Sequence, residues 1–118
     1  MAATVAEVAN PMRRQTRGEF MGFRGGIFDI TADNSYPTSG YSLAASKFGL
    51  KVVVGVVPVL GSFWRNATNM QGAWTSIPTG GASILVGATK DGAGPTFTET
   101  TAATSMTGYA IRVLVFGF

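Results

Sequence analysis

The chain has 118 residues, of which 46% are hydrophobic and 13% are charged, with a net charge of +3 and neither His nor Cys. A single domain of this length can bury roughly two-thirds of its unfolded surface, yet its charged share is about half the level usual in soluble domains. The composition excludes disulfides and Cys or His zinc sites, argues against strong nucleic-acid binding, and predicts a surface that is covered in an oligomer or larger assembly.

Residues 1–24 differ from the rest of the chain in charge and in pattern. They hold four arginines against two glutamates, and they lack the positive start and continuous apolar core of a secretory signal. The alanine-rich stretch at 2–9 predicts a helical turn, which Pro11 would stop because the residue before a proline is pushed out of the helical region. With the glycine-rich stretch at 18–26, this pattern predicts an extended N-terminal arm at 1–24, followed by a compact domain at 25–118.

Arginine, methionine and aromatic side chains are interleaved in the second half of this arm. Protein interfaces are enriched in these residue types and depleted in lysine, so the pattern favours docking on a protein surface. The alternatives are a solvated, disordered terminus and contact with nucleic-acid phosphates. The predicted contact residues are Arg13, Arg14, Arg17, Phe20, Phe23 and Arg24.

From residue 25 onward, short apolar runs separated by glycine, proline and Asx residues predict an all-β domain. We expect a strand at 27–31 and a loop at 33–40. Residues 42–48 are predicted as a short helix, capped by Ser42 and closed by Gly49 in the left-handed conformation. Residues 51–59 form the strongest predicted strand, and their valines make it apolar on both faces, so we expect a neighbour to cover it.

Shorter elements are expected in the second half. The pattern predicts strands at 62–64, 73–75, 83–89, 96–101 and 109–118, a hairpin turn at Asp91-Gly92, and polar turns at 66–72 and 78–81. This spacing, without a long periodic helix, is typical of a β-sandwich or small barrel. Strand alternation puts Phe63 and Trp64 on opposite faces, so Phe63, Trp64 and Trp74 are divided between the core and contacts between subunits.

Catalytic residues are scarce. General acid–base catalysis usually needs His or paired carboxylates, and nothing in the predicted elements brings Asp29 and Asp33 together. The sequence has no Ser-x-x-Lys or Gly-x-Ser-x-Gly motif, and its paired glycines lack the Gly-Lys-Ser/Thr ending of a phosphate loop. A calcium loop at 29–35 is a minor alternative. We therefore expect no enzyme activity, no cofactor and no metal, and the longest apolar run, 50–60, is too short and broken for a membrane helix.

Two segments resemble small virion proteins of tailed bacteriophages. The run Ser35-Tyr36-Pro37-Thr38-Ser39-Gly40, then Leu43, then Phe48-Gly49-Leu50, is similar to their Tyr-Pro-Thr-Gly-Gly-like loop and Leu-Gly-Leu-like turn into a valine-rich strand. The ending at 108–117 resembles their closing strand. Ser39 stands where the pattern often has glycine. The resemblance covers 27–60 and 106–117, while 1–24 and 61–105 lie outside it.

The resemblance implies a capsid decoration (cement) protein with a β-sandwich or jelly-roll-like body. Such a protein lies on the capsid surface and bridges neighbouring major capsid protein subunits, so that many small contacts sum by multivalency. The expected form is a homotrimer, because capsid lattices offer threefold sites. The arm at 1–24 would contact the shell, and Phe63, Trp64 and Trp74 would contact other copies.

Two alternatives stay open at this point. The first is a tail, baseplate or head-fibre component of the same virion. The second is a carbohydrate-binding β-sandwich, in which Trp64 and Trp74 would stack on sugar rings.

Overall fold

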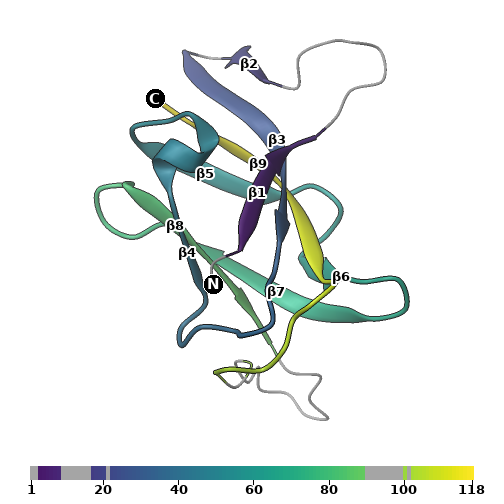
Figure 1. Ribbon diagram of the computed structural model, residues 1–118. Coiled ribbons are helices and arrows are strands. Elements are labelled where there is room, and N and C mark those ends of the chain that lie inside the picture. Colours follow the sequence, from purple (N-terminus) through teal and green to yellow (C-terminus); the bar gives the residue numbers. More distant parts are fainter. Residues whose placement is uncertain (1–2, 9–16, 21, 90–99, 101) are drawn as a thin grey trace.

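The computed structural model describes residues 3–8, 17–20, 22–89, 100 and 102–118 and confirms the all-β class (Figure 1). One short 3₁₀ helix, η1, accompanies the strands in this part of the chain. The elements are β1 (Thr4–Glu7), β2 (Arg17–Phe20), β3 (Phe23–Thr31), β4 (Tyr41–Ala44), η1 (Ala45–Phe48), β5 (Val53–Pro58), β6 (Phe63–Arg65), β7 (Met70–Ser76), β8 (Ser83–Ala88) and β9 (Ala110–Gly117).

The strands form one antiparallel sheet that curls around the core (Figure 1). Its order is β1-β3-β9-β6-β7-β8-β4, with β2 paired with β3 and β5 paired with β9. The closing strand β9 is central, because it pairs with β3 along one edge and with β5 and then β6 along the other. A sandwich or jelly-roll layering of this sheet stays a prediction.

The first strand lies in the sheet rather than in a separate arm. β1 pairs with β3, Val5 packs against the core, and Ala3 is only 2% exposed. The expected helical turn is therefore wrong for residues 4–7, because pairing with β3 outweighs the helix propensity of alanine. The expected division between residues 24 and 25 falls inside β3, and residues 9–16 lie outside the described residues.

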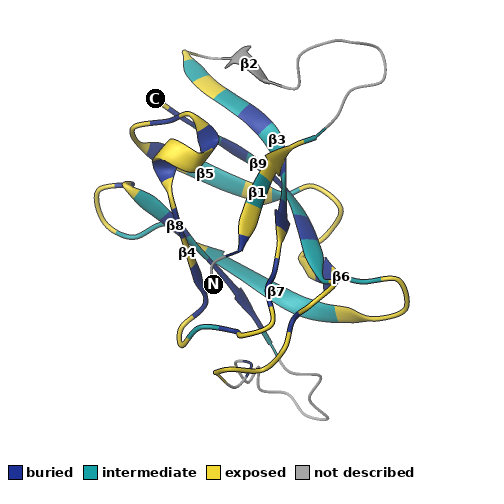
Figure 2. Cartoon of the chain, viewed as in Figure 1, coloured by how far each residue is buried: buried dark blue, intermediate teal, exposed yellow. Residues whose placement is uncertain are grey.

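Buried residues recur along β3, β8 and β9 (Figure 2), and their side chains form the core on the inner face of the sheet. Along β9, buried and half-buried residues alternate, and Ile111, Val113 and Val115 point inward. Trp64 of β6 is the largest fully buried side chain, and its Nε1 donates a hydrogen bond to the carbonyl oxygen of Gly87 at 3.0 Å. A buried indole N–H needs such a partner, so this bond fixes β6 against β8.

The loop at 33–40, which carries much of the resemblance, is built around buried Tyr36. The Tyr36 hydroxyl accepts a hydrogen bond from the backbone N–H of Ala88 at 3.0 Å, and its ring lies edge-on to Tyr41 at 5.6 Å. Oδ1 of Asp33 accepts hydrogen bonds from the Ser35 N–H at 3.0 Å and the Tyr41 hydroxyl at 2.9 Å. These residues hold the loop onto the core, so the motif has a structural role.

The expected helix at 42–48 is shorter than predicted. Ser42 lies in β4 and caps nothing, because η1 begins at Ala45 without a side-chain cap. Gly49 does close the helix with φ 73°, as predicted, and its N–H donates to the carbonyl oxygen of Ser46. The turn delivers Leu50 to the core, where it is 6% exposed.

Most other predicted strands are confirmed. Residues 27–31 lie in β3, and β6, β7, β8 and β9 overlap the strands expected at 62–64, 73–75, 83–89 and 109–118. The polar turn expected at 66–72 ends earlier, because β7 begins at Met70. The Asp91-Gly92 hairpin and most of the strand at 96–101 lie outside the described residues. No helix in the described ranges is long and apolar enough to cross a membrane.

Candidate functional site

The main candidate is an exposed apolar surface on the outer side of β3, β9 and β5. Ile27, Leu114 and Val57 are register partners, so their side chains form one row across the three strands. Val57 is 48% exposed, and the other two are half-buried. Together with Phe23, Phe116 and Phe118, this row defines what we call the outer apolar face.

Three phenylalanines form one end of the outer apolar face. The Phe23 ring lies 5.6 Å from the Phe116 ring and 5.2 Å from the Phe118 ring, in tilted arrangements. Phe116 covers Gly55 on the neighbouring strand, where an added Cβ would lie 2.2 Å from its ring. Phe118 is 57% exposed. This cluster presents aromatic rings beside Val57 of β5, and such a composition is typical of protein interfaces.

The strand β5 is less covered than its sequence predicts. Its inner residues Val53 and Val56 are buried or packed against the core, but Val54 is 43% exposed and Val57 is 48% exposed. The described residues leave the outer side of β5 partly uncovered, so the neighbour expected to cover it stays a prediction. A run of valines favours strand structure, but it does not specify which face of the strand is buried.

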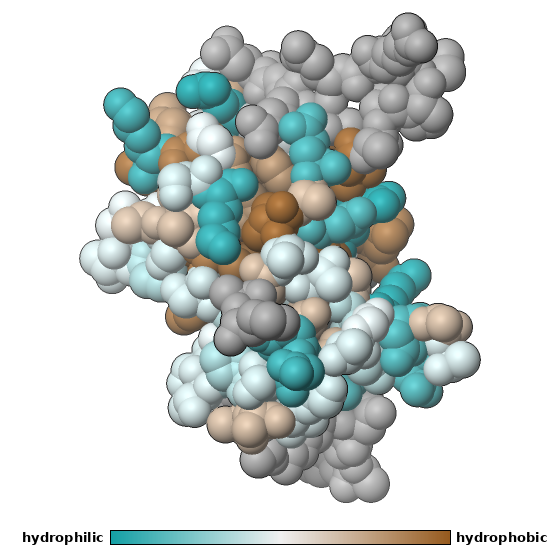
Figure 3. All heavy atoms as spheres, in the orientation of Figure 1, coloured by the Kyte–Doolittle hydropathy of each residue, from teal (hydrophilic) through white to brown (hydrophobic). Residues whose placement is uncertain are grey.

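The apolar surface continues into the loop between β5 and β6 and onto Phe63, the first residue of β6. Val59, Leu60 and Phe63 are 44%, 51% and 42% exposed. Most of the strongly hydrophobic side chains in this view lie in the half of the molecule that holds β1, β3 and β5, interleaved with hydrophilic ones, while the opposite half is mostly pale or hydrophilic (Figure 3). Large exposed apolar patches on a folded domain mark interaction sites.

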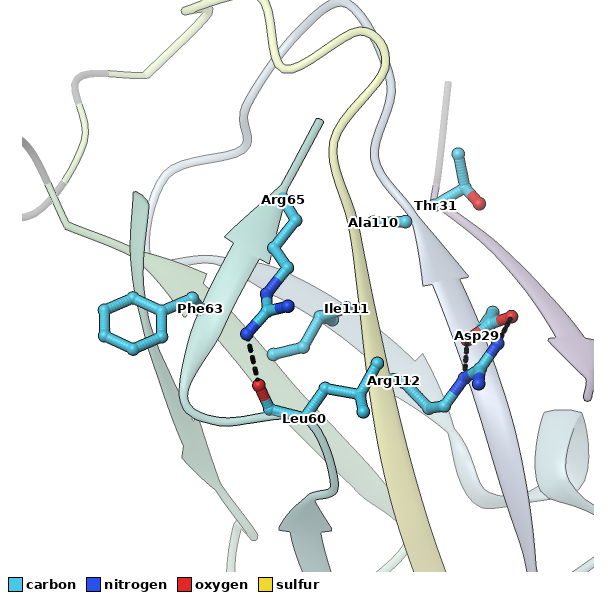
Figure 4. Close-up of a pocket in the computed structure, with 8 residues that line it drawn as sticks. All are labelled: Asp29, Thr31, Leu60, Phe63, Arg65, Ala110, Ile111 and Arg112. Atoms are coloured by element: carbon cyan, nitrogen blue, oxygen red, sulfur yellow. Dashed lines mark hydrogen bonds and ion pairs between the residues drawn. The ribbon is translucent and has the colours of Figure 1, made fainter. Parts of the chain in front are cut away.

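A pocket of about 270 Å³ lies next to this surface, between β6 and the β3–β9 pair (Figure 4). Arg112 binds Asp29 in a bidentate ion pair, with Nε–Oδ1 at 2.8 Å and Nη2–Oδ2 at 3.1 Å. On the opposite side, Nη2 of Arg65 donates to the carbonyl oxygen of Leu60 at 2.6 Å. The lining residues are Asp29, Thr31, Leu60, Phe63, Arg65, Ala110, Ile111 and Arg112.

The predicted capsid-contact residues do not all fall in one place. Phe23 belongs to the outer apolar face, whereas Arg24 is exposed and is its neighbour along β3, so the two side chains point to opposite faces. Arg17 and Phe20 are the end residues of β2, paired with Gly26 and Phe23. Arg13 and Arg14 lie outside the described residues. Among the predicted capsid-contact residues whose side chains are described, Phe23 is thus the one that belongs to the outer apolar face.

The three residues predicted to contact other copies have different environments. Phe63 is 42% exposed at the edge of the pocket. Trp64 is 0% exposed and lies in the core, so its assignment to a contact between copies is corrected. Trp74 is half-buried and covers Gly87, where an added Cβ would lie 1.9 Å from the indole ring. The expectation that Phe63 and Trp64 point to opposite faces is confirmed.

Sequence reasoning missed most of the outer apolar face. The pattern predicts a closing strand at 109–118 and assigns no surface role to Leu114, Phe116 and Phe118. The available signal was that residues 110–118 are largely apolar at both alternating positions, which predicts a strand with two apolar faces. Because the side chains of Ile111, Val113 and Val115 fill the core, the apolar side chains at the alternate positions face away from it.

The acidic residues singled out for chemistry are held apart. Asp29 binds Arg112 on the outer side of β3, and Asp33 is 7% exposed, where it binds Tyr41 and caps the turn at Ser35. Burial, together with the hydrogen bond and charge of Asp33, raises the pKa of Tyr41 to about 12. Among the described residues, no group of three or more His, Cys, Asp or Glu side chains could hold a metal.

Comparison of the chain with known protein families, characterised proteins and solved structures found no match.

Proposed function

We propose that this chain is a virion structural protein that decorates and stabilises a bacteriophage capsid by bridging subunits of the major capsid protein. The observation that carries the proposal is the outer apolar face, in which exposed Val57 and half-buried Ile27 and Leu114 form a row beside an aromatic cluster. A chain with only 13% charged residues and such a face is suited to binding another protein surface.

The mechanism is adhesion in many copies. Burying apolar surface contributes roughly 25 cal/mol per Å², so each copy gains a modest free energy from its contact with the shell. Linked contacts across a lattice raise the overall affinity well beyond that of one contact. A copy that touches two capsid subunits would oppose their separation, and a homotrimer would multiply that effect at a threefold site.

The proposal assigns two surfaces. The outer apolar face, which includes Phe23, would contact the shell together with the adjacent β2–β3 hairpin. Phe63, exposed at the start of β6, would contact another copy. The curled sheet would serve as the β-sandwich or jelly-roll-like body that the resemblance implies. Neither surface needs a catalytic group, a cofactor or a disulfide.

The sugar-binding alternative loses its main support. Trp64 is 0% exposed, and Trp74 packs over Gly87, so these two indoles do not form an exposed platform for sugar rings. A tail, baseplate or head-fibre component would use the same apolar face, and only its location in the virion would differ.

The test is binding to the shell. Purified protein is mixed with expanded empty heads made from the major capsid protein encoded with this chain, and the bound fraction is measured by sedimentation. The proposal requires saturable binding and a raised temperature of head disruption. Unexpanded heads are the control for lattice state. Electron microscopy that places the protein only on the tail would favour the alternative, and absence of binding to any virion part would reject both.

A further inference from the structure

The pocket beside the outer apolar face has a positively charged lining. Its lining holds two guanidinium groups, on Arg65 and Arg112, and one carboxylate, on Asp29, so its formal net charge is +1. Asp29 already takes two hydrogen bonds from Arg112. The excess positive charge therefore belongs to Arg65.

Arg65 is held in place but is not neutralised within the described residues. Its described hydrogen bond runs from Nη2 to the carbonyl oxygen of Leu60, and no described carboxylate forms an ion pair with it. A guanidinium has five N–H donors in a rigid planar fork. Figure 4 shows this fork beside Ile111 and above Leu60, to which the dashed line connects it. One bond orients the group, and several donors stay available to a ligand.

The remaining walls of the pocket are apolar. Leu60 and Phe63 are 51% and 42% exposed, and Ile111 contributes to the lining although it is 2% exposed overall. The volume of about 270 Å³ lies just below the range of roughly 300–1,000 Å³ usual for small-molecule sites. The pocket thus suits one or two side chains better than a whole cofactor.

We propose that this pocket receives an acidic side chain, flanked by an apolar residue, from a protein partner. The carboxylate would accept a charge-assisted hydrogen bond from Arg65, and the apolar neighbour would cover Leu60. The inference rests on the proposed function for the identity of that partner, a segment of the major capsid protein. A nucleic-acid phosphate fits less well, because such sites collect several unpaired basic groups.

The first arm of the test measures binding to expanded heads with Arg65→Gln and with Lys47→Gln as a charge-matched control. Lys47 is exposed on η1 and is not part of the pocket lining. Losing a hydrogen bond between charged groups should weaken binding by about tenfold or more and flatten its salt dependence, while Lys47→Gln behaves like the wild type. If the wild type binds the heads and Arg65→Gln binds equally well, the inference is overturned and the proposed function stands.

The second arm needs neither heads nor a variant. The isotopically labelled wild-type protein is titrated with acetyl-Ala-Leu-Glu-Phe-Ala-amide and with its Glu→Gln counterpart. We expect the amide signals of Leu60, Arg65 and Ala110 to shift more with the Glu peptide. Equal shifts with both peptides, or larger shifts with an oligothymidylate, would overturn the inference. A response to the Glu peptide without binding to heads would reject the proposed function and keep the pocket assignment.

Discussion

Arg112 and Asp29 face each other across β9 and β3, 83 residues apart in the sequence, and form a bidentate ion pair. The pair lies next to the row of Ile27, Leu114 and Val57. Asp29 is two residues after Ile27 in β3, and Arg112 is two residues before Leu114 in β9. Both charged side chains are 36% exposed, so solvent weakens their attraction. The pair thus marks the border between the outer apolar face and the charged pocket, and contributes little to stability.

The first prediction concerns this ion pair. We expect Asp29→Asn to lower the free energy of unfolding by less than about 1 kcal/mol, because exposed ion pairs are screened. The loss should shrink between about 0.05 M and about 1 M salt. Urea unfolding of the single variants and of the double variant with Arg112→Gln measures the coupling. A coupling energy above about 3 kcal/mol, typical of buried pairs, would contradict this interpretation.

The second prediction separates the two tryptophans. Trp64→Phe removes the partner of the buried Gly87 carbonyl and leaves a cavity, so it should cost about 2–4 kcal/mol in unfolding free energy. Trp74→Phe should cost less, because Trp74 is half-buried. Chemical denaturation measures both, and acrylamide should quench the fluorescence of Trp74 more than that of Trp64. Equal costs and equal quenching would argue against the assigned environments.

The third prediction concerns alkaline pH. Because the pKa of Tyr41 is raised from 10.0 to about 12 in the folded state, the neutral phenol contributes its full stabilisation below pH 10. That contribution is lost as the pH rises through about 12. We expect Tyr41→Phe to be less stable than the wild type near neutral pH, with a gap that narrows in this alkaline window. Urea unfolding as a function of pH measures the gap, and a constant gap would refute the assignment.

The fourth prediction concerns Ser39, which has φ 66°. A left-handed conformation is unfavourable for residues with a Cβ atom, so glycine would suit this position better. We expect Ser39→Gly to raise the free energy of unfolding by about 0.5–1 kcal/mol. Ser42→Gly, in the extended strand β4, is the matched control and should lower it. Thermal unfolding of the two variants gives the signs, and destabilisation by both would count against this explanation.

The sequence predicted those elements whose side-chain pattern is local. The strand at 27–31 and the closing strand were recognised from β-branched and aromatic residues bounded by glycine or polar residues. The left-handed Gly49 followed from its place after the predicted helix. In each case the signal lies within a few residues of the element itself.

The missed features depend on contacts between distant segments. β1 lies within the alanine-rich stretch at 2–9, and it is a strand because β3 offers it a paired edge. The outer apolar face exists because β9 brings Phe116 and Phe118 beside Phe23. The pocket joins Asp29 with Arg65 and Arg112 through strand register. No local pattern in the sequence specifies these long-range pairings.

The fifth prediction tests the central claim that the outer apolar face is an adhesive surface. Val57→Lys places a charge at its centre, at a position that is 48% exposed, so the folded monomer should tolerate it. Ser42→Lys, exposed on β4, is the matched control. The measurement is the affinity of each variant for expanded empty heads, with circular dichroism to verify folding. We expect a folded Val57→Lys protein to bind at least about tenfold more weakly and Ser42→Lys to bind like the wild type, whereas unchanged binding of Val57→Lys would contradict the claim.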